Sequence, residues 1–207
     1  MQPAAAVGEV TRAPLPTLAD LEGYPEGINV EIIDGEIIRS PRPAPRHSSA
    51  ASDLVAQLRL AYGRRRGNPG EWLILIEPEL HLPTDRRYLA VIPDLAGWLR
   101  ETLAELPETA SFDLRPDWVC EVVSPTSVRR DRVKKMDFYR RAGVRWLWLV
   151  DPLAETLEAY ASEGERWMLL GTFGEDDRVR VAPFDATEIE LSPLWDRPSP
   201  EPPVDPG

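Results

Sequence analysis

The sequence predicts an α/β (α+β) fold, with a central mixed β-sheet flanked by helices and an antiparallel extension after it. Residues 117–151 carry this prediction, because two apolar, β-prone runs at 117–123 and 145–150 enclose a charged segment with helical periodicity. Two such strands joined by a helical crossover, here expected from about 128 to 141, should pair in parallel. Gly and Asp turns then separate strand-like segments at 156–161, 166–170, 178–181 and 187–191.

The length of 207 residues suits one domain, which we expect to span residues 17–195. The segments at 1–16 and 196–207 are rich in proline and have the composition of flexible tails. No run approaches the roughly 18 apolar residues of a membrane span, so we expect no membrane association. The single cysteine, Cys120, allows no internal disulfide, and a reducing, cytoplasmic location is therefore expected.

The first half of the chain predicts a hairpin, a helix and several short strands. Asp34-Gly35 is a strong signal for a tight hairpin turn, and residues 17–21 have the pattern of a short helical turn. A helix with one apolar stripe is expected over 47–66. Extended segments are expected at 29–33, 36–40, 72–76, 77–82, 88–92 and 93–98.

The formal net charge of −11 argues at first sight against a nucleic-acid partner, but the charge is distributed unevenly. Residues 39–66 contain seven arginines and one acid, and residues 129–145 contain eight basic residues and two acids. Residues 151–205 contain fourteen acids and four arginines. Two basic segments can thus form a phosphate-facing surface, although solvated helix faces are an alternative. The candidates for contact with DNA are Arg42, Arg46, Arg129 and Arg130.

An acid stands inside the first buried strand. Alternation along this strand sends Val119, Glu121 and Val123 to one face of the sheet. An unpaired carboxylate there would be costly, so a cation, a metal ion or a network of donors must accompany Glu121. A second acid, Asp94, follows Pro93 at the start of another expected strand, although a Pro-Asp pair is equally a turn signal.

Two carboxylates on neighbouring strands can hold Mg²⁺ or Mn²⁺ through oxygen ligands, and the backbone carbonyl of Val122 can add a further ligand. Such an ion activates an attacking water, while a nearby ammonium orients that water or stabilises charge on a phosphate. Asp94 and Glu121 are the candidates for the two metal-binding carboxylates, and Lys135 is the candidate for the ammonium. The scattered histidines and lone cysteine make no zinc site, and no organic-cofactor motif occurs.

Glu31 and His47 are further candidates, each with an ordinary structural alternative. Glu31 shares a strand face with Ile33 and so points towards the core or a cleft, unless it is an edge-strand charge. His47 stands at the expected start of a helix, where an anion is favoured, unless it is a surface histidine.

Asp131 and Tyr139 lie on the same side of the expected helix as Lys135, four residues before it and four residues after it. Asp131 is expected to pair with Lys135 or Arg129 rather than to bind metal. Tyr139 is expected to pack in the core.

Several motifs together resemble one known family, the bacterial Uma-type restriction endonucleases, over roughly residues 17–195. They are VEIIDGE at 30–36, His47, PD at 93–94, EVVSPTS at 121–127, the Asp131/Lys135/Tyr139 spacing, and GVRWLWLVDP at 143–152. That family is similar to the PD-(D/E)xK nuclease superfamily. The resemblance implies a restriction endonuclease-like core, dependence on Mg²⁺ and hydrolysis of phosphodiester bonds in DNA.

The resemblance also implies roles for individual residues. It assigns Asp94 and Glu121 as metal ligands, with Glu31 and His47 as further members of the site. The superfamily lysine expected two residues after the glutamate is Val123 here, a departure that resembles members whose lysine has moved to the following helix. Lys135 then fills that role.

The leading hypothesis is therefore a metal-dependent DNA endonuclease, expected to be a homodimer because two symmetric sites suit two antiparallel strands. It predicts that the acids and Lys135 converge in one cleft. An inactive nuclease-like module that binds nucleic acid or protein is the alternative, and it predicts acids that are dispersed or bridged by salt links. A third hypothesis, a structural partner acting through its acidic carboxyl-terminal region, needs no site.

Overall fold

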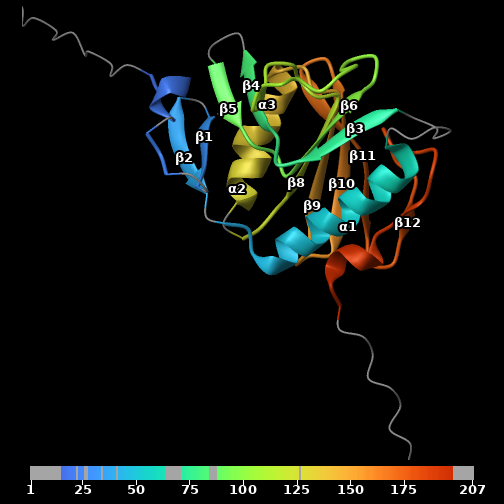
Figure 1. Ribbon diagram of the computed structural model, residues 1–207. Coiled ribbons are helices and arrows are strands. Elements are labelled where there is room, and N and C mark those ends of the chain that lie inside the picture. Colours follow the sequence, from blue (N-terminus) through green and yellow to red (C-terminus); the bar gives the residue numbers. More distant parts are fainter. Residues whose placement is uncertain are drawn as a thin grey trace, which may run out of the picture.

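The computed structural model describes residues 15–197, apart from 22, 26–27, 34, 41, 64–70, 84–87 and 126. The expected tails lie almost wholly outside the described residues. The described strands form a six-stranded sheet, a five-stranded sheet and a two-stranded sheet, accompanied by a few helices (Figure 1). The expected α+β class is confirmed, but its strands are divided among three sheets rather than gathered into one.

The larger sheet has six strands in the order β11-β10-β9-β8-β6-β3. These strands are β3 (Trp72–Ile76), β6 (Leu95–Leu99), β8 (Trp118–Val122), β9 (Trp146–Asp151), β10 (Thr156–Glu163) and β11 (Arg166–Gly174). β8 and β9 pair in parallel, as expected, while β6 pairs antiparallel with β8, and β10 with β9. The larger sheet is therefore mixed.

The smaller sheet has the order β2-β1-β5-β4-β7 and begins with the expected hairpin. Its strands are β1 (Asn29–Ile33), β2 (Glu36–Ser40), β4 (Glu79–Pro83), β5 (Tyr88–Val91) and β7 (Ser111–Phe112). Gly35 in the hairpin turn has a φ of 78°, a conformation that glycine adopts without steric cost. The turn expected at 84–87 lies outside the described residues.

One continuous helical stretch connects β8 to β9. It consists of α2 (Val128–Arg130), a π-helical turn η2 (Asp131–Lys135) and α3 (Met136–Arg141). Gly143, with a φ of 80°, follows its end. The crossover predicted from the sequence is thus present, and it carries Lys135 at the junction of η2 and α3.

The first long helix, α1 (Pro45–Tyr62), begins two residues before its expected start. Proline is favoured at the first helical position, because its fixed φ suits the helix and its missing amide would have no partner there. The expected end of this helix falls partly on residues 64–70, which lie outside the described residues. The expected turn near residue 18 is the short helix η1 (Leu18–Asp20).

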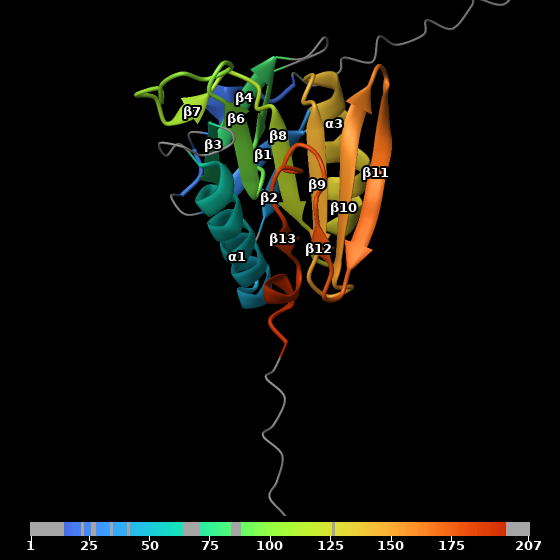
Figure 2. The same cartoon turned by 90° about the vertical axis from the view of Figure 1, so that its right-hand side faces the viewer.

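Two apolar cores lie on opposite faces of the larger sheet. One face packs against α1 and the carboxyl-terminal segment, which contains β12 (Arg178–Val179), β13 (Ile189–Glu190) and η3 (Ser192–Trp195). The other face packs against α3 and the smaller sheet (Figure 2). All four strands expected after residue 152 are present, the last two shorter than expected. Among the described residues, no helix has the length and apolarity needed to cross a bilayer.

The side chains of β8 alternate between the two cores as predicted. Trp118, Cys120 and Val122 belong to the core beneath α1, whereas Val119 and Val123 belong to the core beneath α3. Glu121 therefore points towards α3 and the smaller sheet.

Candidate active site

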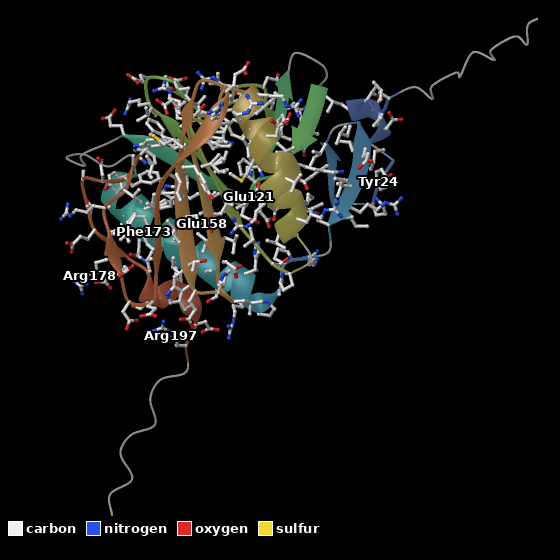
Figure 3. The ribbon with its side chains drawn as sticks, turned by 180° about the vertical axis from the view of Figure 1, so that it is seen from behind. Tyr24, Glu121, Glu158, Phe173, Arg178 and Arg197 are labelled. Atoms are coloured by element: carbon white, nitrogen blue, oxygen red, sulfur yellow. The ribbon has the colours of Figure 1, made fainter. Side chains whose placement is uncertain are left out.

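A pocket of ≈ 860 Å³ lies where the two sheets and the crossover helix meet. The β1–β2 hairpin, the start of α1, the segment before β6, the end of β8 and the α2–η2 helix all contribute to its lining. Figure 3 shows Glu121 in the interior beside this helix. The structure brings together in this lining the predicted residues Glu31, His47, Asp94, Glu121, Val122 and Lys135.

Glu121 is 2% exposed and receives two donors from the helix. The Lys135 ammonium lies 3.1 Å from Oε1 and 3.2 Å from Oε2, and the Tyr139 hydroxyl donates to Oε1 at 2.5 Å. Burial raises the pKa of Glu121 well above its usual range, and the charge of Lys135 opposes this shift. The partners required by an acid in a buried strand are therefore present.

Glu31 reaches the same ammonium from the smaller sheet. Its Oε1 lies 2.9 Å from Lys135 Nζ and accepts the Ile92 amide at 3.0 Å. Lys135 also donates to the Ile92 carbonyl at 3.1 Å. Burial disfavours the charged form of Lys135, but Glu121 and Glu31 together raise its pKa above the usual range, so the ammonium stays protonated. Glu31 thus points inward, and the edge-strand alternative does not apply.

Asp94 turns its carboxylate towards the end of β8. The antiparallel register of β6 and β8, continued by one residue, sets Asp94 opposite Glu121. Its Oδ2 accepts the Val122 amide at 2.6 Å, and its Oδ1 lies 3.1 Å from His47 Nε2. Burial lowers the pKa of His47, but the hydrogen bond and charge of Asp94, together with the charges of Glu77 and Asp131, outweigh burial and raise it. The buried Nδ1 of His47 has no hydrogen-bond partner among the described residues.

A π-helical turn sets the position of Lys135. The Met136 amide bonds the carbonyl of Asp131, five residues back, so the turn is one residue wider than in an α-helix. Such turns recur at functional sites. Asp131 is 2% exposed and forms its ion pair with Arg130, whose Nε lies 3.3 Å from Oδ1. The close ion pair of Asp131 is therefore with Arg130 rather than with Lys135 or Arg129, although Lys135 also acts on Asp131: burial raises the pKa of this carboxyl, and the charge of Lys135 opposes that rise.

Basic side chains surround this acidic floor. Arg42, Arg129 and Arg130, three of the four arginines expected to contact nucleic acid, line the pocket. Arg46 is not part of the lining. It lies near Glu155, whose pKa is lowered mainly by a hydrogen bond from Arg197 and further by the charge of Arg46. Two basic residues that were not singled out from the sequence, Arg39 and Lys134, also line the pocket.

The pocket lining offers carboxylate oxygens, the type of ligand that Mg²⁺ and Mn²⁺ take in proteins. Three carboxylates, those of Glu31, Asp94 and Glu121, lie in the same lining as the ammonium of Lys135. Mg²⁺ usually takes one or two carboxylates and keeps waters or substrate phosphate as its other ligands. No group of three or more His, Cys, Asp or Glu side chains among the described residues is arranged to hold a metal. An ion here would therefore need waters or substrate oxygens as its remaining ligands.

Sequence reasoning missed two contributions to this site. Tyr139 was expected to pack in the core, and it is fully buried, but it also donates to Glu121. Its spacing of four from Lys135 was the available signal. Glu77 lines the pocket directly after β3, with a φ of 46° and its amide bonded to the Asp94 carbonyl at 2.9 Å. An acid that immediately follows an apolar strand was the signal for it.

A family model described as "Uma2: Putative restriction endonuclease" matches residues 15–192, most of the chain. The chain belongs to the Uma2 family. Among solved structures, this Uma2 chain is similar to one described as a putative nuclease belonging to DUF820 from Anabaena variabilis ATCC 29413. The TM-score is 0.66 and the identity 22%, over 87% of this chain and 97% of the other. A comparison with curated proteins gives no match.

Membership of the Uma2 family confirms the resemblance found in the sequence motifs. The structural likeness confirms the nuclease-like fold. For this Uma2 protein, the family therefore supports nuclease activity in general terms, and the pocket around Lys135 is the candidate site for it.

Proposed function

We propose that this protein is a metal-dependent endonuclease that hydrolyses phosphodiester bonds in DNA. One observation carries the proposal: Glu31, Asp94, Glu121 and Lys135, which are far apart in the sequence, line a single pocket. Basic side chains in the same lining suit a phosphate backbone. We further propose that it acts in the cytoplasm and that it forms a symmetric homodimer.

Asp94, Glu121 and the Val122 carbonyl would hold Mg²⁺ or Mn²⁺, which when bound supplies Lewis-acid polarisation of the phosphodiester and lowers the pKa of an attacking water. Lys135 serves as a fixed positive charge rather than as a general base, because two glutamates keep it protonated. That charge orients both glutamates and stabilises negative charge developing on phosphate oxygens. His47 orients the Asp94 carboxylate through its contact at 3.1 Å.

A catalytically inactive nuclease-like module that binds nucleic acid or protein is a second candidate, and one observation favours it. Lys135 bridges Glu31 and Glu121 at 2.9 and 3.1 Å, as expected for a site in which salt links have replaced metal binding. The basic lining would then bind DNA without cutting it.

Nicking of supercoiled plasmid in Mg²⁺ or Mn²⁺ separates these two functions. We expect the wild type to nick the plasmid, and Asp94→Ala and Lys135→Ala to lose about 100-fold or more in rate, the cost of removing one transition-state contact. Arg178→Ala is the control, since this arginine is exposed, pairs with Glu190 and lies outside the pocket lining. Binding of plasmid without nicking would favour the inactive module, and equal nicking by all variants would contradict catalysis at this site.

A further inference from the structure

Three of the groups on which the proposed reaction depends lie deep in the pocket, whereas the side chain of the proposed metal ligand Asp94 is 16% exposed. Glu31, Glu121 and Lys135 are each 2% exposed. A reacting phosphate must come within about 3 Å of such groups, or within one water of them. The scissile phosphodiester therefore has to enter the pocket and cannot react while lying across its mouth.

Two contacts between α2–η2 and β2 bridge the walls of the pocket on one side. Arg130 Nη1 donates to Ser40 Oγ at 2.8 Å, and both residues line the pocket. Lys134 Nζ contacts Glu36 Oε2 at 2.5 Å, which ties the same helix to the same strand a second time. Figure 1 shows the β1–β2 hairpin standing beside the crossover helix. The Lys134–Glu36 pair is exposed, so the Arg130–Ser40 hydrogen bond is the stronger of these two links between α2–η2 and β2.

The volume of the pocket suits a short piece of one strand. A cavity of ≈ 860 Å³ falls within the range of about 300–1,000 Å³ that holds a single small ligand. A continuous duplex is instead recognised over roughly 1,000–2,500 Å² of protein surface, and its stacked bases and partner strand flank every phosphate. An unpaired strand can bend away from its neighbours and bring one phosphodiester to the floor.

Apolar side chains lie among the basic ones in the pocket lining. Val133 is 64% exposed, and Ile38, Pro43 and Pro125 line the same pocket. Duplex DNA hides the faces of its bases, whereas an unpaired strand exposes them to apolar and cationic side chains. Apolar surface beside Arg129 and Arg130 thus fits a strand with unstacked bases better than it fits a duplex backbone.

We propose, on the basis of the endonuclease function proposed above, that the pocket takes an unpaired DNA strand. The protein then cuts single-stranded DNA, and unpaired segments within a duplex, in preference to continuous duplex. Three observations support this inference together. They are the burial of Glu31, Glu121 and Lys135, the contacts between α2–η2 and β2, and the exposed Val133 in the pocket lining.

The test compares three labelled oligonucleotide substrates of one sequence with the full-length protein and Mn²⁺. They are a single strand, a fully paired duplex, and a duplex with a central unpaired bubble. We expect the single strand and the bubble to be cut at least tenfold faster than the duplex, with cuts in the bubble substrate inside the unpaired region. Equal or faster cutting of the duplex would overturn the preference and leave the endonuclease function standing. Failure to cut any of the three would overturn both.

A matched pair of variants tests whether the apolar wall touches the strand. Val133→Asp places a negative charge in the pocket lining, and Leu153→Asp places one at a similarly exposed aliphatic position, 60% exposed, outside the lining. We expect Val133→Asp to raise KM for the single strand about tenfold, and Leu153→Asp to leave it unchanged. Melting temperatures should match the wild type for both variants. A wild-type KM for Val133→Asp would contradict contact between this wall and the strand.

Discussion

Lys135 makes three contacts, with the buried carboxylates of Glu31 and Glu121 and with the partly buried carbonyl of Ile92. Removing one partner from such a buried set leaves charges that nothing compensates, whereas replacing the whole set by neutral groups of similar shape is often harmless. The stability of the site and its chemistry can therefore be separated by mutation.

We expect Lys135→Met to lower the free energy of unfolding by about 3–5 kcal/mol, because both glutamates would remain buried without their cation. The triple variant Glu31→Gln, Glu121→Gln, Lys135→Met should recover most of that loss and still show no nicking. Urea unfolding followed by tryptophan fluorescence measures the first effect, and the plasmid assay measures the second. A triple variant as unstable as Lys135→Met would contradict the account of Lys135 as a compensating charge.

Tyr139→Phe removes one hydroxyl from the site and leaves the ring in place. We expect a loss of about 1.5–3 kcal/mol in stability, as for a hydrogen bond to a charged group, and a higher Mn²⁺ concentration for half-maximal nicking, because Glu121 loses a donor that orients it. Tyr160→Phe is the control, since its hydroxyl donates to Glu158 at 2.7 Å outside the pocket. An equal shift in Mn²⁺ dependence for both variants would exclude a specific role for Tyr139.

At the scale of elements, the β10–β11 hairpin anchors the helix that carries Lys135. Arg132 on η2 donates to both carboxylate oxygens of Glu158 on β10, at 2.6 and 3.1 Å. Trp167 on β11 donates to the Met136 carbonyl at 2.8 Å. The helix is thus bonded on one side to the larger sheet and on the other side, through Lys134 and Arg130, to β2.

The Arg132–Glu158 contact predicts a dependence of stability on pH. The hydrogen bond from Arg132 lowers the pKa of Glu158 below its ordinary value of 4.5. A carboxyl with a lowered pKa in the folded state contributes stability above the pKa of the unfolded state, and this contribution is lost as pH falls through the folded value. Between pH 7 and pH 3, the melting temperature of the wild type should therefore fall more than that of Glu158→Gln. Equal decreases would mean that this contact adds no stability.

The local patterns of the sequence predicted those elements whose partners lie nearby in the chain. The crossover and the alternation around Glu121 follow from periodicity within one segment. The separate smaller sheet could not be predicted in this way. Its strands β1 and β5 lie about 60 residues apart in the chain, with Ile32 opposite Ala90, and strand propensity does not show which distant strands pair. The π-helical turn could not be predicted from the sequence either, because one extra residue in a turn of five hardly changes the spacing of apolar and charged residues along the helix.

The same distinction holds for the site. Glu121 could be predicted because an acid among valines violates the pattern of a buried strand. The third contact of Lys135 is with the backbone carbonyl of Ile92, and no side chain in the sequence indicates it. The role of Tyr139 was harder to predict, because a tyrosine in a helix packs well in a core whether or not its hydroxyl has a partner.

At the scale of the whole molecule, a net charge of −11 coexists with a basic pocket lining. If DNA binds through this lining, each phosphate contact removed should lower the slope of log affinity against log salt by about 0.7–0.9. We expect Arg42→Ala combined with Arg129→Ala to weaken DNA binding and reduce the slope accordingly. Arg178→Ala, drawn far from Glu121 in Figure 3, should change neither. Unchanged salt dependence in the double variant would exclude these arginines from the interface.

Diffraction from crystals soaked in Mn²⁺ tests the central claim most directly. We predict an anomalous peak between Asp94 and Glu121, within roughly 2–2.5 Å of their carboxylate oxygens and near the Val122 carbonyl. Under the same conditions, no peak should occur in crystals of Asp94→Asn. A wild-type crystal without a peak at this place, with Lys135 still bonded to both Glu31 and Glu121, would contradict a metal-dependent site.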